Sequence, residues 1–367
     1  MLGLSFDGKP AREDVLLRVC TTASTRNLPD AENYLFMSEN FCALSVLMKY
    51  FAGKIDLVFI DPPFNTMQDF YISEGRANSV STSRVRKAYS DKMPLEKFLA
   101  FLYERLILIH ELLSERGSLY LHIDCKTGHY VKILLDEVFG ADCFRNDITR
   151  IKSNPKNFHR RAWGNQHDMI LFYAKDPSRN IWNDVKAPLT DSDIARRFPK
   201  ADPDGRRYTT IPLHAPGETH GLTGRAWRGI PVPDGRHWRT DPAEFDRLDA
   251  QGRIEWSRTG SPRIKKYADE HEGMKIQDVW TFKDPQNPVY PTEKNHGMLK
   301  LIIEQSSLPG SIVLDCFAGS GGTLICAQEL GRRFIGIDNS EEAVRIMRAG
   351  LKGEYAFIDW SSSVFYA

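Results

Sequence analysis

Short apolar segments alternate with amphipathic helical segments at both ends of this 367-residue chain, and this alternation constrains the fold more than any other feature. Between about residues 31 and 150, strand-like runs are followed by stretches with apolar residues at helical spacing. The same alternation of strand-like and helix-like segments returns from residue 291 onward. Because successive strand–helix units place parallel strands side by side with helices on both faces, the pattern predicts an α/β fold built around a mostly parallel sheet.

The expected elements are short. The strands predicted from their apolar runs are 33–37, 55–60, 118–124, 311–315 and 333–338. The helices predicted from their periodicity are 41–53, 94–117, 128–140 and 340–351. We expect the helix over 94–117 to end at Gly117, because glycine commonly terminates a helix.

The middle of the chain differs in composition and in its pattern of apolar residues. From about 151 to 290, Pro, Gly, Arg and Trp are frequent, and turn sequences interrupt short β-like pieces, which indicates a loop-rich insertion. The predicted organisation is an N-terminal extension, a first half of the α/β domain, an inserted region and a second half, with boundaries at 1–30, 31–150, 151–287 and 288–367.

The charged residues are distributed unevenly along the chain, and this distribution is more informative than the net charge. The net charge is only +1, yet residues 145–285 carry 26 Lys and Arg against 20 Asp and Glu. The segment 150–161 has five positive residues and no acid, and 75–92 has five positive residues and one acid. Such segments are typical of nucleic-acid contacts, although solvated surface loops have the same composition.

Other classes of protein are disfavoured. The six cysteines form no CxxC pair and the histidines no ligand-spaced pair, so we expect reduced thiols, no metal site and a cytoplasmic protein. No run of about 18 apolar residues is present, so we expect no membrane span. The N-terminus does not resemble a signal peptide.

A glycine-rich turn follows the strand at 311–315. The sequence Cys-Phe-Ala-Gly-Ser-Gly-Gly (316–322) leads directly into a helix, so the backbone can turn tightly and a ligand can approach the helix N-terminus. The next strand ends at Asp338, in the place of an acid that accepts hydrogen bonds from ribose hydroxyls. The alternative is a βα turn that needs glycine only for steric reasons.

The strand at 55–60 ends in Asp61-Pro62-Pro63-Phe64. An exocyclic amine on a base is a poor nucleophile, because its lone pair is delocalised into the ring. The Asp61 carboxylate and the Pro62 carbonyl are suited to accept its two N–H bonds and favour a tetrahedral nitrogen. Phe64 offers a flat face for an extruded base. The alternative is that Asp-Pro merely starts a turn.

These residues, in this order, resemble the DNA amino-methyltransferases that act on adenine N6 or cytosine N4. The order of the Asp-Pro-Pro-Phe segment, the irregular region and the glycine turn is similar to the β group of that family. The resemblance covers about residues 33–350. It implies a Rossmann-like S-adenosylmethionine-dependent methyltransferase fold, circularly permuted, with an inserted target-recognition region.

The resemblance also assigns residues. The implied catalytic residues are Asp61, Pro62, Pro63 and Phe64. The implied S-adenosyl-L-methionine-binding residues are Asp315, Phe317, Ala318, Gly319, Ser320, Gly321, Asp338, Glu39, Thr292 and Lys294. Three of these come from segments that depart from the family pattern: Glu39 stands where the family has aspartate, and Thr292 and Lys294 lie in a variant of the family's HPTQKP segment.

The inserted region is expected to recognise double-stranded DNA. The candidate DNA-binding residues are Arg84, Arg86, Lys87, Lys152, Lys156, Arg160, Arg161, Arg225, Arg236 and Lys265. The segment 75–92 is expected to close over the flipped base or to contact DNA. For the tryptophans near these arginines, a role in a small core is the more frequent alternative.

The resemblance is compatible with a homodimer, a restriction-modification partner and a prokaryotic protein associated with the nucleoid while it acts. Asp-Pro-Pro-Phe favours adenine N6 over cytosine N4. The alternatives are a cytosine N4 or RNA methyltransferase, and a non-catalytic DNA-binding subunit of a restriction-modification complex.

Overall fold

The computed structural model describes residues 3–24, 26–63, 69–73, 76–78, 85–90, 93–155, 159, 161–258, 260–286, 288, 290 and 293–361. For 69–73, 76–78 and 85–90 only the backbone is described. The chain divides into two compact units: Met1–Val185 together with Gln277–Ala367, and Lys186–Ile276.

The first unit is built on a nine-stranded sheet in the order β17-β7-β8-β6-β2-β18-β19-β1-β20. Strand β8 is antiparallel to both β6 and β7, whereas the other neighbouring pairs are parallel. The strands are β1 (Tyr34–Met37), β2 (Ile55–Ile60), β6 (Leu113–Ile123), β7 (Phe144–Ile151), β8 (His167–Ala174), β17 (Val279–Thr281), β18 (Ile312–Asp315), β19 (Arg333–Asp338) and β20 (Ala356–Asp359). The mostly parallel α/β sheet expected from the alternating pattern is confirmed.

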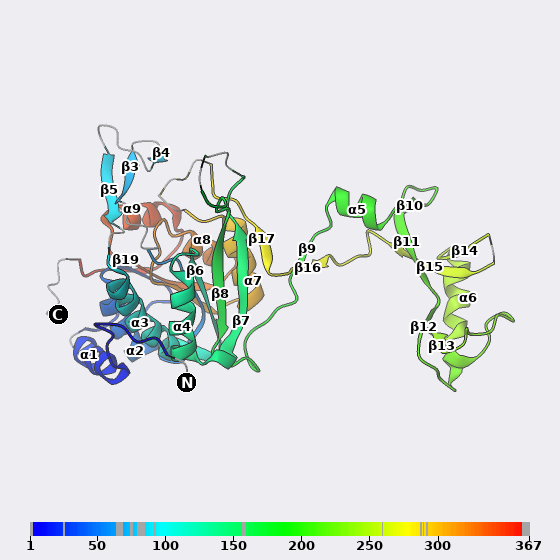
Figure 1. Cartoon of the computed structure of the whole chain (residues 1–367), viewed down its shortest axis with the longest axis horizontal. Helices are drawn as coiled ribbons and strands as arrows, with labels where there is room; N and C mark the ends of the chain where they lie inside the picture. Colours follow the sequence, from blue (N-terminus) through cyan, green and yellow to red (C-terminus); the bar gives the residue numbers. More distant parts are fainter. Residues whose placement is uncertain are drawn as a thin grey trace. The chain divides into compact units, whose positions relative to one another are not determined.

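Helices pack against both faces of this sheet (Figure 1). They are α1 (Arg12–Ser24), α2 (Asn40–Phe51), α3 (Leu95–Leu112), α4 (Gly128–Phe139), α7 (His296–Ser306), α8 (Gly322–Glu329) and α9 (Glu341–Gly350), with a short 3₁₀ turn, η1 (Ala141–Cys143). In β2, Val58 and Ile60 pack in the cluster of α1–α4, while Leu57 and Phe59 pack in the cluster of α7–α9. The period of two along the strand therefore divides its side chains between two cores.

Strand β2 comes from the first part of the chain and β18 from the last, yet they are parallel neighbours. Val313 pairs with Leu57, and Leu314 pairs with Val58. Parallel neighbours end at the same edge of a sheet, so the residues that follow β2 and β18 meet there. The two motif-bearing strand ends are thus adjacent.

The helix predicted over 94–117 ends earlier, at Leu112, and β6 begins at Leu113. Leu113 is extended, with φ −62° and ψ 135°, and pairs with Ile55 of β2. Gly117 therefore does not terminate the helix. A Cβ there would lie 2.8 Å from the Ile55 carbonyl oxygen, so glycine is needed for the close approach of two strands.

The N-terminal extension contributes to the first core. Val15 and Val19 of α1 are buried in the cluster formed with α2, α3 and α4. Arg12 of α1 pairs with Glu111 at the end of α3, and Arg18 pairs with Glu104 at 2.7 Å.

The backbone of β3 (Asp69–Ser73), β4 (Arg76–Asn78) and β5 (Val85–Ser90) forms a small antiparallel sheet.

The second unit, Lys186–Ile276, is narrower than the inserted region predicted over 151–287. The reason is that β8 and β17, both within that range, pair with the main sheet. The elements of the unit are β9 (Lys186–Ala187), α5 (Asp191–Arg197), β10 (Lys200–Ala201), β11 (Arg207–Pro212), β12 (His214–Pro216), η2 (Leu222–Gly224), β13 (Arg236–Trp238), α6 (Pro242–Ala250), β14 (Ile254–Trp256), β15 (Pro262–Tyr267) and β16 (Met274–Lys275).

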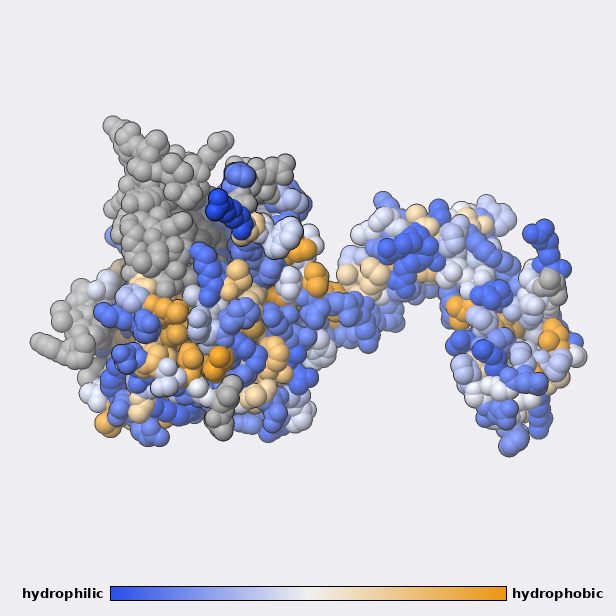
Figure 2. Space-filling view, in the orientation of Figure 1, coloured by the Kyte–Doolittle hydropathy of each residue, from blue (hydrophilic) through white to orange (hydrophobic). Residues whose placement is uncertain are grey.

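A small aromatic core holds the second unit. Trp227, Trp238 and Phe245 are buried together, and the indole Nε1 of Trp238 donates to the Arg225 carbonyl at 2.7 Å. Trp256 is 42% exposed and stacks on Trp227. Of these three tryptophans, Trp227 and Trp238 are therefore core residues. Hydrophilic residues dominate the visible surface of this unit (Figure 2).

Within the described residues, no helix is long and apolar enough to cross a membrane.

Core packing in the first unit is testable at Leu106, which is fully buried in α3. We expect L106A to lower the free energy of unfolding by about 2–5 kcal/mol, because it removes buried methyl groups and leaves a cavity. Urea denaturation followed by circular dichroism measures this change. The control is L17A in α1, where the side chain is 68% exposed. Equal effects of the two variants would contradict the assignment of the core.

Candidate active site

The end of β2 places Asp61 at the edge of the sheet, beside the end of β6. Ile60 pairs with Leu121, so the next position along β6, His122, faces Asp61. Pro62 is buried and Pro63 is partly buried. Phe64, also predicted to be catalytic, lies outside the described residues.

Both carboxylate oxygens of Asp61 have cationic or N–H partners. His122 Nδ1 lies 2.6 Å from Oδ1, and Lys294 Nζ lies 2.5 Å from Oδ2. The side chains of Asp61 and Lys294 are 16% and 9% exposed. Burial by itself raises the pKa of Asp61, but the charges and hydrogen bonds of Lys294 and His122 hold that pKa below its ordinary value of 3.8. Asp61 is therefore an ionised acceptor at neutral pH.

The ion pair at Asp61 continues along the ends of β6, β8 and β7. His122 Nε2 lies 3.4 Å from Asp168 Oδ2. Asp168 Oδ1 pairs with Lys152 Nζ at 2.6 Å, and Arg150 NH1 lies 4.0 Å from Asp168 Oδ2. Burial raises the pKa of Asp168, yet the hydrogen bond and charge of His122, together with Lys152, lower it to about 2.

Arg150 forms the far side of this network. Its side chain is 1% exposed, and NH2 pairs with Asp284 Oδ1 at 2.5 Å. Its Nε donates to the Phe282 carbonyl at 3.0 Å. A buried guanidinium is costly unless its donors are satisfied, and this arginine has acceptors on two sides. We call the set Lys294, Asp61, His122, Asp168, Lys152, Arg150 and Asp284 the buried charge network, because its central members are 1–2% exposed, although Asp284 at its end is 51% exposed.

The second strand end, after β18, is the glycine turn. Gly319 and Gly321 have φ values of 51° and 81°, which favour glycine. A Cβ at Gly321 would also lie 2.5 Å from the Met347 side chain. Helix α8 begins at Gly322, so its N-terminus opens at this turn. Phe317 packs edge-on against Phe101 of α3, with ring centroids 6.0 Å apart.

Asp315, which is buried, and Asp338, which is partly buried, flank the glycine turn. Asp315 accepts the Phe317 N–H at 3.0 Å, and Asp338 accepts the Gly319 and Ser340 N–H groups at 2.8 Å each. Burial raises the pKa of Asp338 to about 6, against the lowering effect of these N–H groups. Burial also raises the pKa of Asp315 to about 7, with the charges of Asp61 and Asp338 adding to the rise.

Glu39 lies at the start of α2, next to the end of β19. Its Oε2 accepts the Cys42 N–H at 3.1 Å and caps the helix, while Oε1 pairs with the buried Arg105. The Glu39 side chain remains 41% exposed. The Ser38 N–H donates to the Asp338 carbonyl at 3.0 Å, so this segment adjoins the ribose-binding acid predicted from the sequence. The contact of Glu39 with a cofactor stays a prediction.

The structure brings Lys294 to Asp61, although the resemblance implied only a cofactor role for it. Thr292, in the same segment, lies outside the described residues. Ala318 is buried and Ser320 is partly buried within the glycine turn.

The predicted DNA-binding residues fall into several groups. Arg84, Lys156 and Arg160 lie outside the described residues, and the side chains of Arg86 and Lys87 are not described. Lys152 belongs to the buried charge network. Lys265 pairs with Asp202 at 2.6 Å and is 14% exposed. The predicted residues that the structure places at the surface are Arg161, Arg225 and Arg236.

His122, Asp168 and Arg150 were not predicted from the sequence. Two of them had a signal in the sequence, because His122 lies within the otherwise apolar segment 119–123 and Asp168 directly precedes the apolar segment 169–174. A polar residue inside a buried strand needs a partner. Only the order of the strands shows that the partner is the catalytic candidate Asp61.

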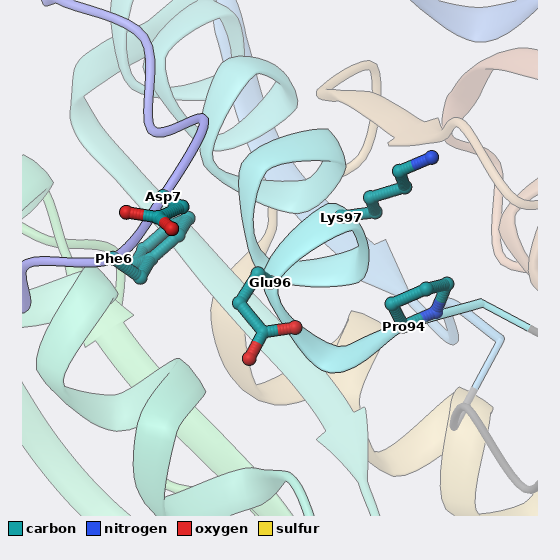
Figure 3. Close-up of a pocket in the computed structure, with 5 residues that line it drawn as sticks. All are labelled: Phe6, Asp7, Pro94, Glu96 and Lys97. Carbon is teal, nitrogen blue, oxygen red and sulfur yellow. The ribbon is translucent and has the colours of Figure 1, made fainter.

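A surface pocket of about 420 Å³ lies away from the predicted site residues. It is lined by Phe6 and Asp7 of the N-terminal segment and by Pro94, Glu96 and Lys97 at the start of α3 (Figure 3). None of these side chains belongs to the two strand ends, so this pocket contributes nothing to the site.

Comparison with known proteins gives one family match. Residues 55–349 match the model of N6/N4 methyltransferases described as DNA methylase. The Type II methyltransferase M.EcaI of Enterobacter cloacae is 40% identical over 84% of this chain and 67% of its own length. The Mod subunit of the type III restriction-modification enzyme StyLTI of Salmonella typhimurium is 25% identical over 83% of this chain and 50% of its own length. The DNA adenine methyltransferase YhdJ of Escherichia coli is 23% identical over 83% of this chain and 78% of its own length.

The raised pKa of Asp315 predicts a pH effect on stability. Folding favours the protonated form, so its stabilising effect is complete below the ordinary pKa of 3.8 and is lost as pH rises through about 7. We expect D315N, which is neutral at every pH, to gain stability relative to the unchanged protein by about 1–3 kcal/mol between pH 5 and pH 8.

Urea unfolding at both pH values measures this gain. D30N, at an exposed aspartate, is the control and should follow the pH dependence of the unchanged protein. A gain for D315N that does not grow with pH would contradict the raised pKa.

Proposed function

Because this chain belongs to the DNA methylase family, we propose that it transfers a methyl group from S-adenosylmethionine to the N6 amino group of adenine in double-stranded DNA. The observation that carries the proposal is the adjacency of two strand ends, an ionised carboxylate after β2 and a glycine turn after β18. One offers an acceptor for an amine, and the other offers room for a ligand against the backbone.

The residues at the glycine turn fit S-adenosylmethionine. With no Cβ at Gly319 and Gly321, a ligand can approach the main chain and the N-terminus of α8. Asp338 would hold the ribose hydroxyls, since each of its oxygens keeps a lone pair beyond its bond to a backbone N–H. Asp315, Phe317, Ala318 and Ser320 would line the rest of the site. When bound, S-adenosylmethionine supplies an electrophilic methyl group on a positively charged sulfur.

The chain's own residues would prepare the amine. The Asp61 carboxylate and the Pro62 carbonyl would accept its N–H bonds, which directs the nitrogen lone pair at the methyl group for in-line attack. Asp61 suits this role because it is ionised and held in place by His122 and Lys294. A base inside a duplex cannot reach the partly buried carboxylate of Asp61, so the target base would be flipped out of the helix. Phe64 would stack on it.

Adenine is proposed over cytosine because the catalytic segment reads Asp-Pro-Pro-Phe. The name of the relative YhdJ, a DNA adenine methyltransferase, is in keeping with this choice. Cytosine N4 is the second candidate, because the family model includes N4 methyltransferases. We also place the protein in a restriction-modification system, as the name of the relative StyLTI Mod subunit suggests.

Three arginines of the second unit are suited to bind DNA phosphates. Arg236 lies 3.3 Å from His214 Nδ1, and Arg239 donates to the Pro212 carbonyl at 3.0 Å. Arg263 donates to the Thr210 hydroxyl and carbonyl at 2.8 and 2.9 Å. Burial lowers the pKa of His214, and the charges of these three arginines lower it further, so the four side chains are near one another.

Other arginines of the same unit are neutralised by acids. Arg247 pairs with Glu244 at 2.5 Å, and Arg196 pairs with Asp193 at 2.8 Å. By contrast, none of the residues described in this unit offers a carboxylate to Arg236, Arg239 or Arg263 within ion-pair distance. An arginine held by a neutral acceptor has no carboxylate beside it to neutralise its positive charge. That charge remains available to an incoming phosphate. We therefore assign DNA backbone contacts to this arginine surface.

The catalytic role of Asp61 is tested with D61N. We expect the rate of methyl transfer to duplex DNA to fall about 100-fold or more, because the neutral amide no longer polarises the amine. Binding of S-adenosylmethionine, measured by calorimetry, should change little. The matched control is D56N in the same strand, which should retain the rate. Full activity of D61N would contradict the mechanism.

The acceptor base is identified by mass spectrometry of nucleosides from the methylated DNA. We expect N6-methyladenine. N4-methylcytosine would instead establish the second candidate, and methylation of RNA alone would exclude DNA as the substrate. If the unchanged protein methylates neither nucleic acid, the proposed function is wrong.

The arginine surface is tested by the salt dependence of binding to duplex DNA. We expect R236A/R239A to weaken binding and to reduce the slope of log K against log salt by about 2, because about 0.9 is lost for each phosphate contact. The matched control R196A/R247A removes the same charge from acid-paired positions and should leave the slope unchanged. Equal slopes for the two double variants would contradict the assignment.

A further inference from the structure

His122 is a buried histidine to which the methyl-transfer mechanism above assigns no contact with the substrate. It is fully buried near the end of β6, with its two ring nitrogens facing different partners. Asp61, the catalytic candidate, lies on the Nδ1 side, and Asp168 and Arg150 lie on the Nε2 side. Strand positions buried like this one usually carry apolar residues, as the neighbours Leu121 and Ile123 do.

The geometry fixes the proton on Nδ1. Asp61 is ionised, so its Oδ1 can only accept a hydrogen bond. The 2.6 Å contact therefore requires that His122 Nδ1 carries the hydrogen and donates it. This bond, together with the Lys294 ion pair, holds the Asp61 carboxylate in one orientation.

The other ring nitrogen has a partner in either protonation state. A protonated Nε2 faces the carboxylate of Asp168 at 3.4 Å, while an unprotonated Nε2 faces the NH1 donor of Arg150 at 3.5 Å. Asp168 and Arg150 are themselves fixed by Lys152 and Asp284. The Nδ1–Asp61 bond is therefore preserved whichever state Nε2 adopts.

Stability alone gives little reason for this arrangement. Three side chains of the network, His122, Asp168 and Arg150, are 1–2% exposed. Burying ionic groups costs several kcal/mol each, and well-packed apolar residues of similar volume are often as stabilising or more so. A buried polar network that ends on a reacting carboxylate is instead typical of a device that orients it.

We propose that His122 is a positioning residue, which donates from Nδ1 to Asp61 and is itself oriented by Asp168 and Arg150. The proposal rests on the proposed function in so far as Asp61 receives the amine. It adds that the orientation and charge of Asp61 depend on a histidine of the adjacent strand. The groups that face the pair are Lys294 and Asp315 at Asp61, and Asp168, Arg150, Lys152 and Asp284 behind the imidazole.

The test compares H122N, H122F and D168N. Asparagine can place an N–H donor near the position of Nδ1, whereas phenylalanine fills the space without a donor. We expect H122F to lower kcat by about 10- to 100-fold with KM for DNA little changed, as for other groups that orient a reacting side chain. H122N should recover most of this loss, and D168N should have an intermediate effect.

The pH profile separates positioning from a merely structural role. His122 helps to lower the pKa of Asp61, so its loss should move the acid limb of the kcat/KM profile to higher pH in H122F and less in H122N. H110N and H110F, at a histidine of α3 that lies beside Glu111, are matched controls and should leave the acid limb in place. Equal rate losses for H122N and H122F, without movement of the acid limb, would overturn the proposal.

A second measurement does not depend on activity. The ¹³C resonance of the Asp61 carboxyl, assigned by its absence in D61N, reports the ionisation of that group directly. We expect its midpoint to rise in H122F and to rise less in H122N. An unchanged midpoint would overturn the positioning role even if methyl transfer is confirmed. A raised midpoint in a protein without methyltransferase activity would keep the pairing and refute the proposed function.

Discussion

The parallel pairing of β2 with β18 is the contact on which the site depends. It joins an early strand to a late one and brings Asp61 and the glycine turn to the same edge of the sheet. A shift of the register by one residue would turn Leu57 and Val58 toward the wrong cores. The two apolar cores therefore fix the positions of the polar residues at the strand ends.

The sequence predicted the parts of this structure that local patterns determine. Alternating periodicity identified the strands and the helices, and glycine spacing identified the turn at 316–322. The end of α3 was predicted at Gly117, because glycine is a common helix terminator. The glycine is required instead by the close approach of β2, a contact between distant residues that periodicity cannot show. The second unit is narrower than the predicted insertion for the same reason, since β8 and β17 lie within the irregular stretch of the sequence but pair with the main sheet.

The buried charge network likewise could not be predicted from local sequence patterns. Asp61 and Lys294 could be singled out from the motifs around them, but not their contact, because the two residues lie far apart in the chain. His122 and Asp168 look like single polar residues in apolar strands. Their role follows only from the strand order β8-β6-β2, which places them in line with Asp61. Local sequence thus identifies reactive groups, whereas topology determines which groups act together.

Three aspartates along one edge of the sheet have different charge states because they face different groups. Asp61 faces a lysine and a histidine, which outweigh the effect of burial and keep it ionised. Asp315 and Asp338 face backbone N–H groups and a hydroxyl, which do not outweigh burial, so their pKa values rise to about 7 and about 6. The edge therefore avoids three full negative charges close together, which would repel one another in a buried setting. A positively charged ligand at the glycine turn would favour the ionised forms of Asp315 and Asp338. In the proposed function, the acids that flank the turn would therefore suit a cationic ligand, while the acid at the end of β2 would already be charged to accept from a neutral amine.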